Sequence, residues 1–219
     1  MQIDLGNKKV TIKPWKTNTK KEFLNLIKNK GENVTQEEIM DVLLYPYIEE
    51  SDIFLNRYEL EYVLVNIRNI SIKANIEMTV SCDICKTSFE ISENVLEFTD
   101  YRKANYNGKW KDLSSKNSNK TITSLAEKYG ENESDIEMLL HLSEINSKKV
   151  ESFEDVYNIF SEMTLDELEN LYEEYDKVKP YLEMKITKKC PHCGSNNIFY
   201  FDEIPSFFDP LLPKEIRVK

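Results

Sequence analysis

The sequence lacks the motifs of several large enzyme classes and has no long apolar run. Five glycines in 219 residues leave little material for a phosphate-binding loop, and neither G-x-G-x-x-G nor G-x-x-x-x-G-K-[ST] occurs. Only two histidines are present, and the hydrolase motifs G-x-S-x-G and H-E-x-x-H are missing. No stretch approaches the roughly 18 apolar residues that span a bilayer, and the first residues do not resemble a signal peptide. We therefore predict a protein that is not an enzyme, takes no small-molecule substrate and contacts no membrane.

Basic residues are also in deficit. The chain has 29 Lys and Arg against 39 Asp and Glu, which gives a formal net charge of −10. This charge repels a phosphate backbone, so a nucleic-acid partner would need a local basic patch. Aromatic residues are frequent, with 12 Tyr, 10 Phe and 2 Trp, which is too many for a disordered chain. We expect a globular protein that folds in the cytosol.

The four cysteines fall in two close pairs, Cys82-Asp-Ile-Cys85 and Cys190-Pro-His-Cys193. Cytosolic thiols stay reduced, so this pattern suggests a metal site rather than disulfides. Two C-x-x-C turns can supply the four thiolates that zinc binds in a tetrahedron. The pairs are separated by 104 residues, but loop-closure entropy grows only with the logarithm of length. We predict one structural zinc ion on Cys82, Cys85, Cys190 and Cys193, with no open position for catalysis.

Other interpretations of these residues are less favoured. The two pairs could be unrelated thiols, although alternating strand patterns flank both of them. His192 could replace a cysteine, but it lies inside a set of four thiolates that is already complete. His141 lies among leucines and is expected to be a core or boundary residue. The carboxylates of residues 166–176 have the spacing of a solvated helix face.

The N-terminal region, residues 1–69, is predicted to form a short strand followed by three helices. An alternating apolar stretch there precedes residues at helical spacing. Thr35 and Glu38 match a capping box, which opens the second helix. Either Ser51 or Asn56 is expected to cap the third helix.

Two segments, residues 70–95 and 184–203, are predicted to be the halves of a split zinc ribbon. From Ile70 the apolar period changes to two and continues through Val80, which is typical of a half-buried strand that ends on Cys82. The same alternation flanks the second cysteine pair. Each pair is therefore expected at the turn of a β-hairpin.

Between these halves, residues 96–183 are predicted to be an all-α insertion. It begins with a loop over residues 101–118, because no period is clear there. Helical spacing and end signals then mark four segments: residues 121–129, 134–142, 152–163 and 165–179. The predicted fold class is α+β, with an N-terminal helical region, a split four-cysteine zinc ribbon of two β-hairpins and a long all-α insertion.

The chain closes with a tail, residues 204–219, that is rich in proline and aromatic residues. Three prolines in nine residues exclude a regular helix there. Phe207 and Phe208 offer apolar anchors, either for a partner or for the chain's own core.

Several segments together carry a resemblance to a known family. They are Lys13-Pro-Trp15, Leu60-Glu-Tyr-Val-Leu64 with Ile67-Arg68, Val80-Ser-Cys-Asp-Ile-Cys85, Cys190-Pro-His-Cys193 and Ile204-Pro-Ser-Phe-Phe208. With these segments the chain resembles the T4-type bacteriophage baseplate protein family. The resemblance implies a structural component or assembly factor of a contractile tail, in the hub region of the baseplate. It implies other hub or wedge proteins as partners, met in the host cytoplasm during assembly and in the virion tail if the protein is retained.

A nucleic-acid-binding zinc ribbon is the alternative function. Lys185, Lys188 and Lys189 lie beside the second cysteine pair and Lys86 beside the first, so they could form a local basic patch. Phe199, Tyr200 and Phe201 could stack on bases. The net charge of −10 opposes this interpretation, so we expect no nucleic-acid partner.

Overall fold

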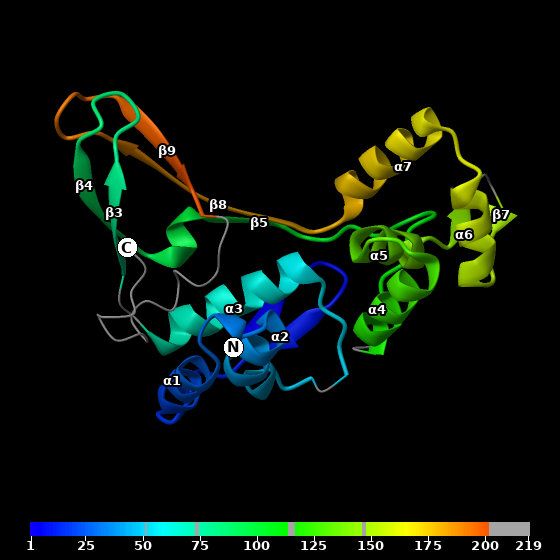
Figure 1. The fold of residues 1–219 in the computed structure, drawn as a ribbon, viewed down its shortest axis with the longest axis horizontal. Helices are drawn as coiled ribbons and strands as arrows, with labels where there is room; N and C mark the ends of the chain where they lie inside the picture. Colours follow the sequence, from blue (N-terminus) through cyan, green and yellow to red (C-terminus); the bar gives the residue numbers. More distant parts are fainter. Residues whose placement is uncertain (51, 73–74, 114–116, 146–147, 202–219) are drawn as a thin grey trace.

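The computed structural model describes residues 1–50, 52–72, 75–113, 117–145 and 148–201. Figure 1 shows an elongated molecule in which β-hairpins lie at one end, a group of helices lies at the other and the N-terminal helices lie between and below them. Two predictions, the cap at Ser51 and the tail with Phe207 and Phe208, lie outside the described residues. The α+β class is confirmed, whereas the division at residues 69, 95, 183 and 203 remains a proposal.

The N-terminal region is a small hairpin packed on helices. Its elements are β1 (Gln2–Asp4), β2 (Lys9–Thr11), α1 (Thr19–Lys30), η1 (Gly31–Asn33), α2 (Gln36–Leu43), η2 (Tyr45–Tyr47) and α3 (Arg57–Ser71). Thr35 and Asn56 each form a complete capping box, which confirms both predicted helix starts. The apolar faces of the helices and strands bury one core that includes Leu5, Leu43 and Leu64. The prediction missed β1, because three residues are too few to show a period.

The ribbon region contains two antiparallel units. The first is the hairpin of β3 (Ile76–Ser81) and β4 (Ser88–Glu93), which is followed by η3 (Val95–Phe98). The second is a three-stranded sheet in the order β5 (Thr99–Arg102), β8 (Tyr181–Lys189) and β9 (Asn196–Tyr200). Two predictions were wrong here: α3 continues through Ser71, so the strand begins later than expected, and β5 replaces the start of the predicted loop.

The insertion confirms the four predicted helices. They are α4 (Asn117–Tyr129), α5 (Glu133–His141), α6 (Phe153–Ser161) and α7 (Leu165–Val178). Ser152 and Thr164 form capping boxes that start α6 and α7. A short hairpin of β6 (Glu144–Ile145) and β7 (Lys148–Lys149) interrupts the helices, which the prediction did not anticipate. His141 is fully buried, as expected for a core residue.

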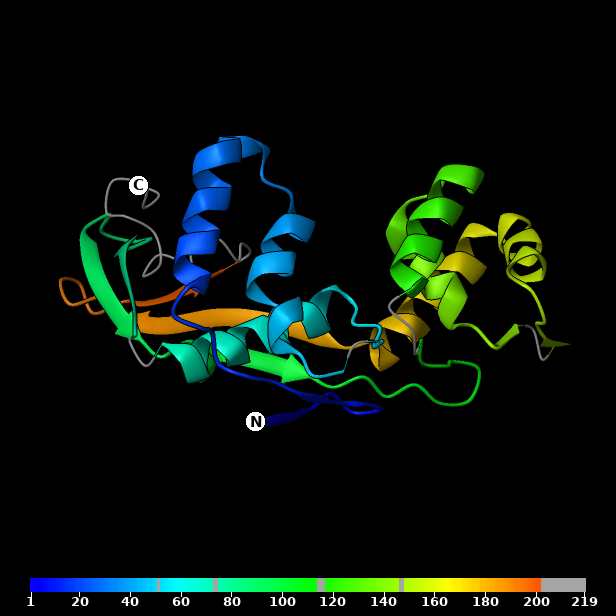
Figure 2. The same ribbon diagram turned by 90° about the horizontal axis from the view of Figure 1, so that it is seen from below.

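A buried polar contact fastens the insertion to the N-terminal region. Lys8 Nζ lies 3.0 Å from Glu59 and 3.3 Å from Asp112, and it donates to the Phe54 carbonyl at 2.8 Å. The Phe54 ring enters the apolar cluster of α4 and α5, beside Ile122. Burial raises the pKa of Glu59, and the ion pair with Lys8 opposes that shift. The two groups of helices therefore share contacts although they stand apart in Figure 2.

Candidate metal centre

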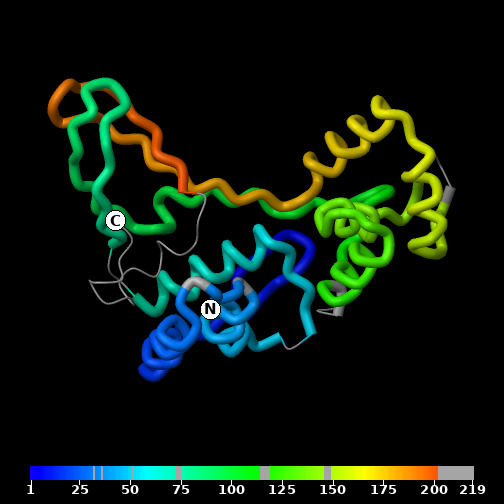
Figure 3. The backbone as a smooth tube through the Cα atoms, viewed as in Figure 1, coloured from blue at the N-terminus to red at the C-terminus, as the bar shows by residue number. Residues whose placement is uncertain are grey.

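The turns of the two hairpins lie side by side (Figures 1 and 3). The four cysteine sulfur atoms, which these turns carry, form one cluster. All four lie within 4.8 Å of one another. Cys82 Sγ lies 3.6 Å from Cys193 Sγ, and Cys85 Sγ lies 3.7 Å from Cys190 Sγ. Four thiolates at about 2.3 Å from a tetrahedral zinc ion stand about 3.8 Å apart, whereas a disulfide needs about 2.05 Å. The donor set and its spacing therefore fit one four-coordinate zinc ion and not a pair of disulfides.

Both cysteine pairs adopt the same backbone turn. We call residues 82–87 the first knuckle and residues 190–195 the second knuckle. In each, the N–H of the residue after the second cysteine donates to the carbonyl of the first cysteine, at 2.9 Å and 3.0 Å respectively. That residue has a positive φ in both turns, 59° at Lys86 and 75° at Gly194. The repeated turn brings the two thiols of each knuckle together.

Hydroxyl groups lie against the sulfur atoms. Ser195 Oγ is 3.3 Å from Cys82 Sγ and 3.0 Å from Cys193 Sγ, so one side chain contacts both knuckles. Thr87 Oγ1 occupies the equivalent place in the first knuckle, 3.4 Å from Cys85 Sγ. The Ser195 hydroxyl, followed by the Cys85 backbone N–H, lowers the pKa of the Cys82 thiol to about 5. Ser195 also lowers the pKa of Cys193. Thiolates are the species that bind zinc, so these contacts favour metal binding at Cys82 and Cys193, whereas burial raises the pKa of Cys190.

A buried amide clasps the two knuckles together. Asn197 is only 2% exposed, and its Oδ1 accepts a hydrogen bond from the Asp83 N–H at 2.9 Å. Its Nδ2 donates to the Ser195 carbonyl at 3.1 Å. Asn197 follows the second knuckle in β9, whereas Asp83 lies within the first. This side chain therefore links the halves of the site through protein atoms alone.

Apolar packing supports the site from below. The Phe89 and Phe199 rings, one from each hairpin, lie edge to face with centroids 6.1 Å apart. Beneath them a buried cluster joins Ile91 of β4, Ile186 of β8 and Val65 of α3. Cys82 and Cys190, the first cysteines of the two knuckles, are buried, while Cys85 and Cys193 are exposed. The helical body therefore fixes the position of both hairpins.

The structure brings together all four predicted cysteines and no other predicted candidate. His192 is exposed, in agreement with the expectation that it faces solvent. The carboxylates of α7 are exposed, and among the described residues only the cysteines form a cluster with metal-ligand spacing. Sequence reasoning missed Ser195 and Asn197. A hydroxyl two residues after each C-x-x-C pair was the available signal for Ser195, but Asn197 depends on a contact across 114 positions.

The fold and the site together define a class: an α+β protein with a split ribbon whose four thiols are arranged as for a closed metal shell. A model of the T4 bacteriophage base plate protein family matches residues 1–209, so the chain belongs to this family and the predicted resemblance is confirmed. No curated protein and no solved structure shows significant similarity to the chain. Within the described ranges, no helix has both the length and the apolar character needed to traverse a bilayer.

Proposed function

We propose that this baseplate-family protein is a structural component or assembly factor of the hub region, and that it acts through contacts with other baseplate proteins. The family match over residues 1–209 carries this proposal. Large apolar side chains on the ribbon surface support a role in binding, since Ile84 is 72% exposed and Tyr200 is 59% exposed. The protein would assemble in the host cytoplasm and act without catalysis.

We further propose that Cys82, Cys85, Cys190 and Cys193 hold one zinc ion, which serves to join the two hairpins. The sulfur spacing described above supports this role. A shell of four thiolates leaves no coordination position for water or substrate, so the ion would contribute stability and not chemistry.

Two ion pairs argue against the nucleic-acid alternative. Lys185 pairs with Glu183, and Lys188 pairs with Glu93. These contacts pair two of the four lysines in the basic patch that the alternative requires. We expect no measurable binding to DNA or RNA at physiological salt. Micromolar affinity that is lost when Lys185, Lys188 and Lys189 are replaced would instead favour a nucleic-acid role.

Fractionation of assembled tails tests the main proposal. The chain should co-purify with the baseplate or its hub intermediate in a fixed ratio, with about one zinc ion per chain. A matched preparation from which baseplates are missing controls for free protein. A chain that never accompanies baseplates or their intermediates would overturn the proposal.

A further inference from the structure

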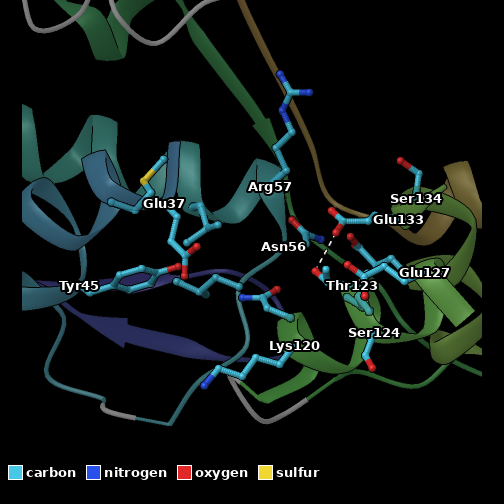
Figure 4. A pocket seen from close by; sticks show the side chains of 16 residues that line it. Glu37, Tyr45, Asn56, Arg57, Lys120, Thr123, Ser124, Glu127, Glu133 and Ser134 are labelled. Carbon is cyan, nitrogen blue, oxygen red and sulfur yellow. Dashed lines mark hydrogen bonds between the residues drawn. The ribbon is translucent and has the colours of Figure 1, made fainter. Parts of the chain in front are cut away.

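A groove separates the N-terminal helices from the insertion, at a distance from the cysteine site. It has a volume of about 740 Å³ and is bounded by α2, the start of α3, α4 and α5. A second hollow of about 430 Å³ adjoins it and shares six of its residues, including Glu37, Tyr45 and Lys120. Figure 4 shows Glu37 and Tyr45 on one side of the groove, with Glu127 and Glu133 on the other. The groove therefore has two walls from different parts of the chain.

The groove has an apolar base and an acidic rim. Met40, Leu55 and Ile122 line it and are nearly fully buried. Among the described residues, the charged side chains that line the groove and the adjoining hollow are six carboxylates and two cations: Glu37, Asp41, Glu50, Glu127, Glu133 and Glu137 with Arg57 and Lys120. Burial raises the pKa of Glu137 to about 7, so its negative charge is about half present at neutral pH, while the other carboxylates keep the rim negative.

Three of the six carboxylates have no cationic partner among the described residues. In the part of the chain that the structure describes, Glu37, Asp41 and Glu127 enter no ion pair. Arg57 is paired with Glu61 at 2.9 Å, so its charge is already compensated. Burial, and then the charges of Asp41 and Glu37, raise the pKa of the Tyr45 hydroxyl, in keeping with a negative field in the groove. A positively charged ligand would therefore be attracted to the groove.

We propose that this groove binds a basic segment of a partner protein, in which Lys or Arg side chains meet the rim and apolar side chains contact the base. Charge complementarity selects a cationic occupant, and the apolar base selects a peptide over a simple cation. The inference rests on the proposed function, because it supplies the chemistry of a partner contact. Its site is separate from the ribbon.

A fluorescent peptide of Lys and Leu with helical spacing serves as the probe, with a Glu and Leu peptide of the same pattern as its counterpart. Binding to the full chain is followed by fluorescence anisotropy at physiological salt, where attraction over more than about 8 Å is screened. We expect saturable binding of the Lys peptide only. A photoreactive version of that peptide should cross-link to α2 or α4.

Charge reversal locates the contact. Glu37→Lys with Glu127→Lys alters both walls of the groove and should weaken peptide binding by at least about tenfold. Glu169→Lys with Glu173→Lys makes the same charge change on exposed positions of α7 and should weaken it by less than about threefold. If the first pair of changes prevents folding, Glu37→Gln with Glu127→Gln replaces it and should still weaken binding more than the α7 pair.

Equal effects of the groove and α7 changes, binding of the Glu peptide, or cross-links confined to other surfaces would each overturn the groove proposal. None of these results bears on whether the chain accompanies baseplates, so the proposed function would stand. Conversely, a chain that binds the Lys peptide in the groove but never accompanies baseplates would remove the proposed function and leave the groove as a binding site.

Discussion

The two knuckles have the same backbone conformation but differ in the residues that form it. Each closes with the same hydrogen bond to the first cysteine's carbonyl, and each places a positive φ after the second cysteine. In the second knuckle this residue is Gly194, which adopts that conformation freely. In the first it is Lys86, for which the left-handed region costs about 1–2 kcal/mol. The comparison teaches that the cysteine spacing selects the turn even where the local residue opposes it.

The hydrogen bond between Asp83 of the first knuckle and the Asn197 side chain has no counterpart with the roles of the two hairpins exchanged. Asn197 accepts a hydrogen bond from the Asp83 N–H. Counted from the first cysteine of each knuckle, Pro191 is equivalent to Asp83 and Phe89 is equivalent to Asn197. The reverse contact would therefore need an N–H at Pro191 and an amide side chain at Phe89. Proline has no N–H, and phenylalanine has no polar group to accept one. Phe89 instead packs on Phe199. The first knuckle therefore contributes apolar packing at the position where the second contributes a hydrogen bond.

Removal of the metal should produce the largest effect, because the proposed ion needs both knuckles at once. Cys82→Ser and Cys190→Ser each leave three thiolates, so both should lower the free energy of unfolding by several kcal/mol and to a similar extent. Chelation of the wild-type protein should do the same. Elemental analysis and thermal unfolding measure these changes. A melting curve that is unchanged in either variant would show that the knuckles do not share an ion.

Loss of the clasp should have the next largest effect. Asn197→Ala removes two hydrogen bonds, one from the Asp83 N–H and one to the Ser195 carbonyl, each worth about 0.5–1.5 kcal/mol. It should therefore cost about 1–3 kcal/mol of stability and speed the release of zinc to a chelator. Asn196→Ala, at the exposed neighbouring position of β9, is the matched control and should change stability by less than about 0.5 kcal/mol. Urea unfolding and chelator competition give both quantities. Equal results for the two variants would contradict a clasp.

Exchange of the two turn residues should give smaller, opposite effects. Gly194→Ala should destabilise the protein by about 1 kcal/mol through backbone strain, since the added Cβ would meet nothing closer than Lys189 Cε at 3.8 Å. Lys86→Gly should stabilise it by up to about 1 kcal/mol, because the strain is relieved. Chemical unfolding of metal-loaded protein measures both. If both substitutions changed the free energy of unfolding in the same direction, the proposed difference in backbone strain between the two turns would be refuted.

The smallest effect concerns the hydroxyl groups in metal-free protein. Ser195→Ala should raise the pKa of the Cys82 thiol from about 5, whereas Thr87→Ala should leave it unchanged because Thr87 contacts Cys85. Because the pKa of Cys82 is lower in the folded state than the unfolded value of about 8.5, its ionisation stabilises the fold at pH values above about 8.5. This contribution to the free energy of unfolding is lost as the pH falls through about 5. Ser195→Ala should reduce this pH dependence. Thiolate absorbance, followed during a pH titration, is the measurement.

Local chemistry made much of the fold predictable. Capping boxes at Thr35 and Thr164 place an oxygen and a carboxylate at fixed spacing, so the helix starts can be found without knowledge of tertiary contacts. The two C-x-x-C pairs are equally local, and their number matches one closed shell. The junction after Ile70 was placed too early because apolar residues there satisfy both a helical and an alternating pattern, and the packing of α3 decides between them.

Features that depend on distant contacts were not predictable. β5 has only four residues and owes its conformation to pairing with β8, about 80 positions later in the chain. Asn197 looks like an ordinary polar residue of a strand until Asp83 is placed beside it. The acidic groove likewise forms only when α2 and α4 face each other. In each case the two partners are far apart in the sequence, and no local pattern indicates that they are in contact.

The separation of the knuckles has a consequence for the newly made chain. At a synthesis rate of roughly 5–20 residues per second, the 104 residues between Cys85 and Cys190 take about 5–20 s to emerge from the ribosome. During that interval the first knuckle has two thiols and no second pair to complete a shell. If the four thiols hold one ion as proposed, the site would close only after the insertion has been translated, and only a chain with both hairpins in place would retain the ion.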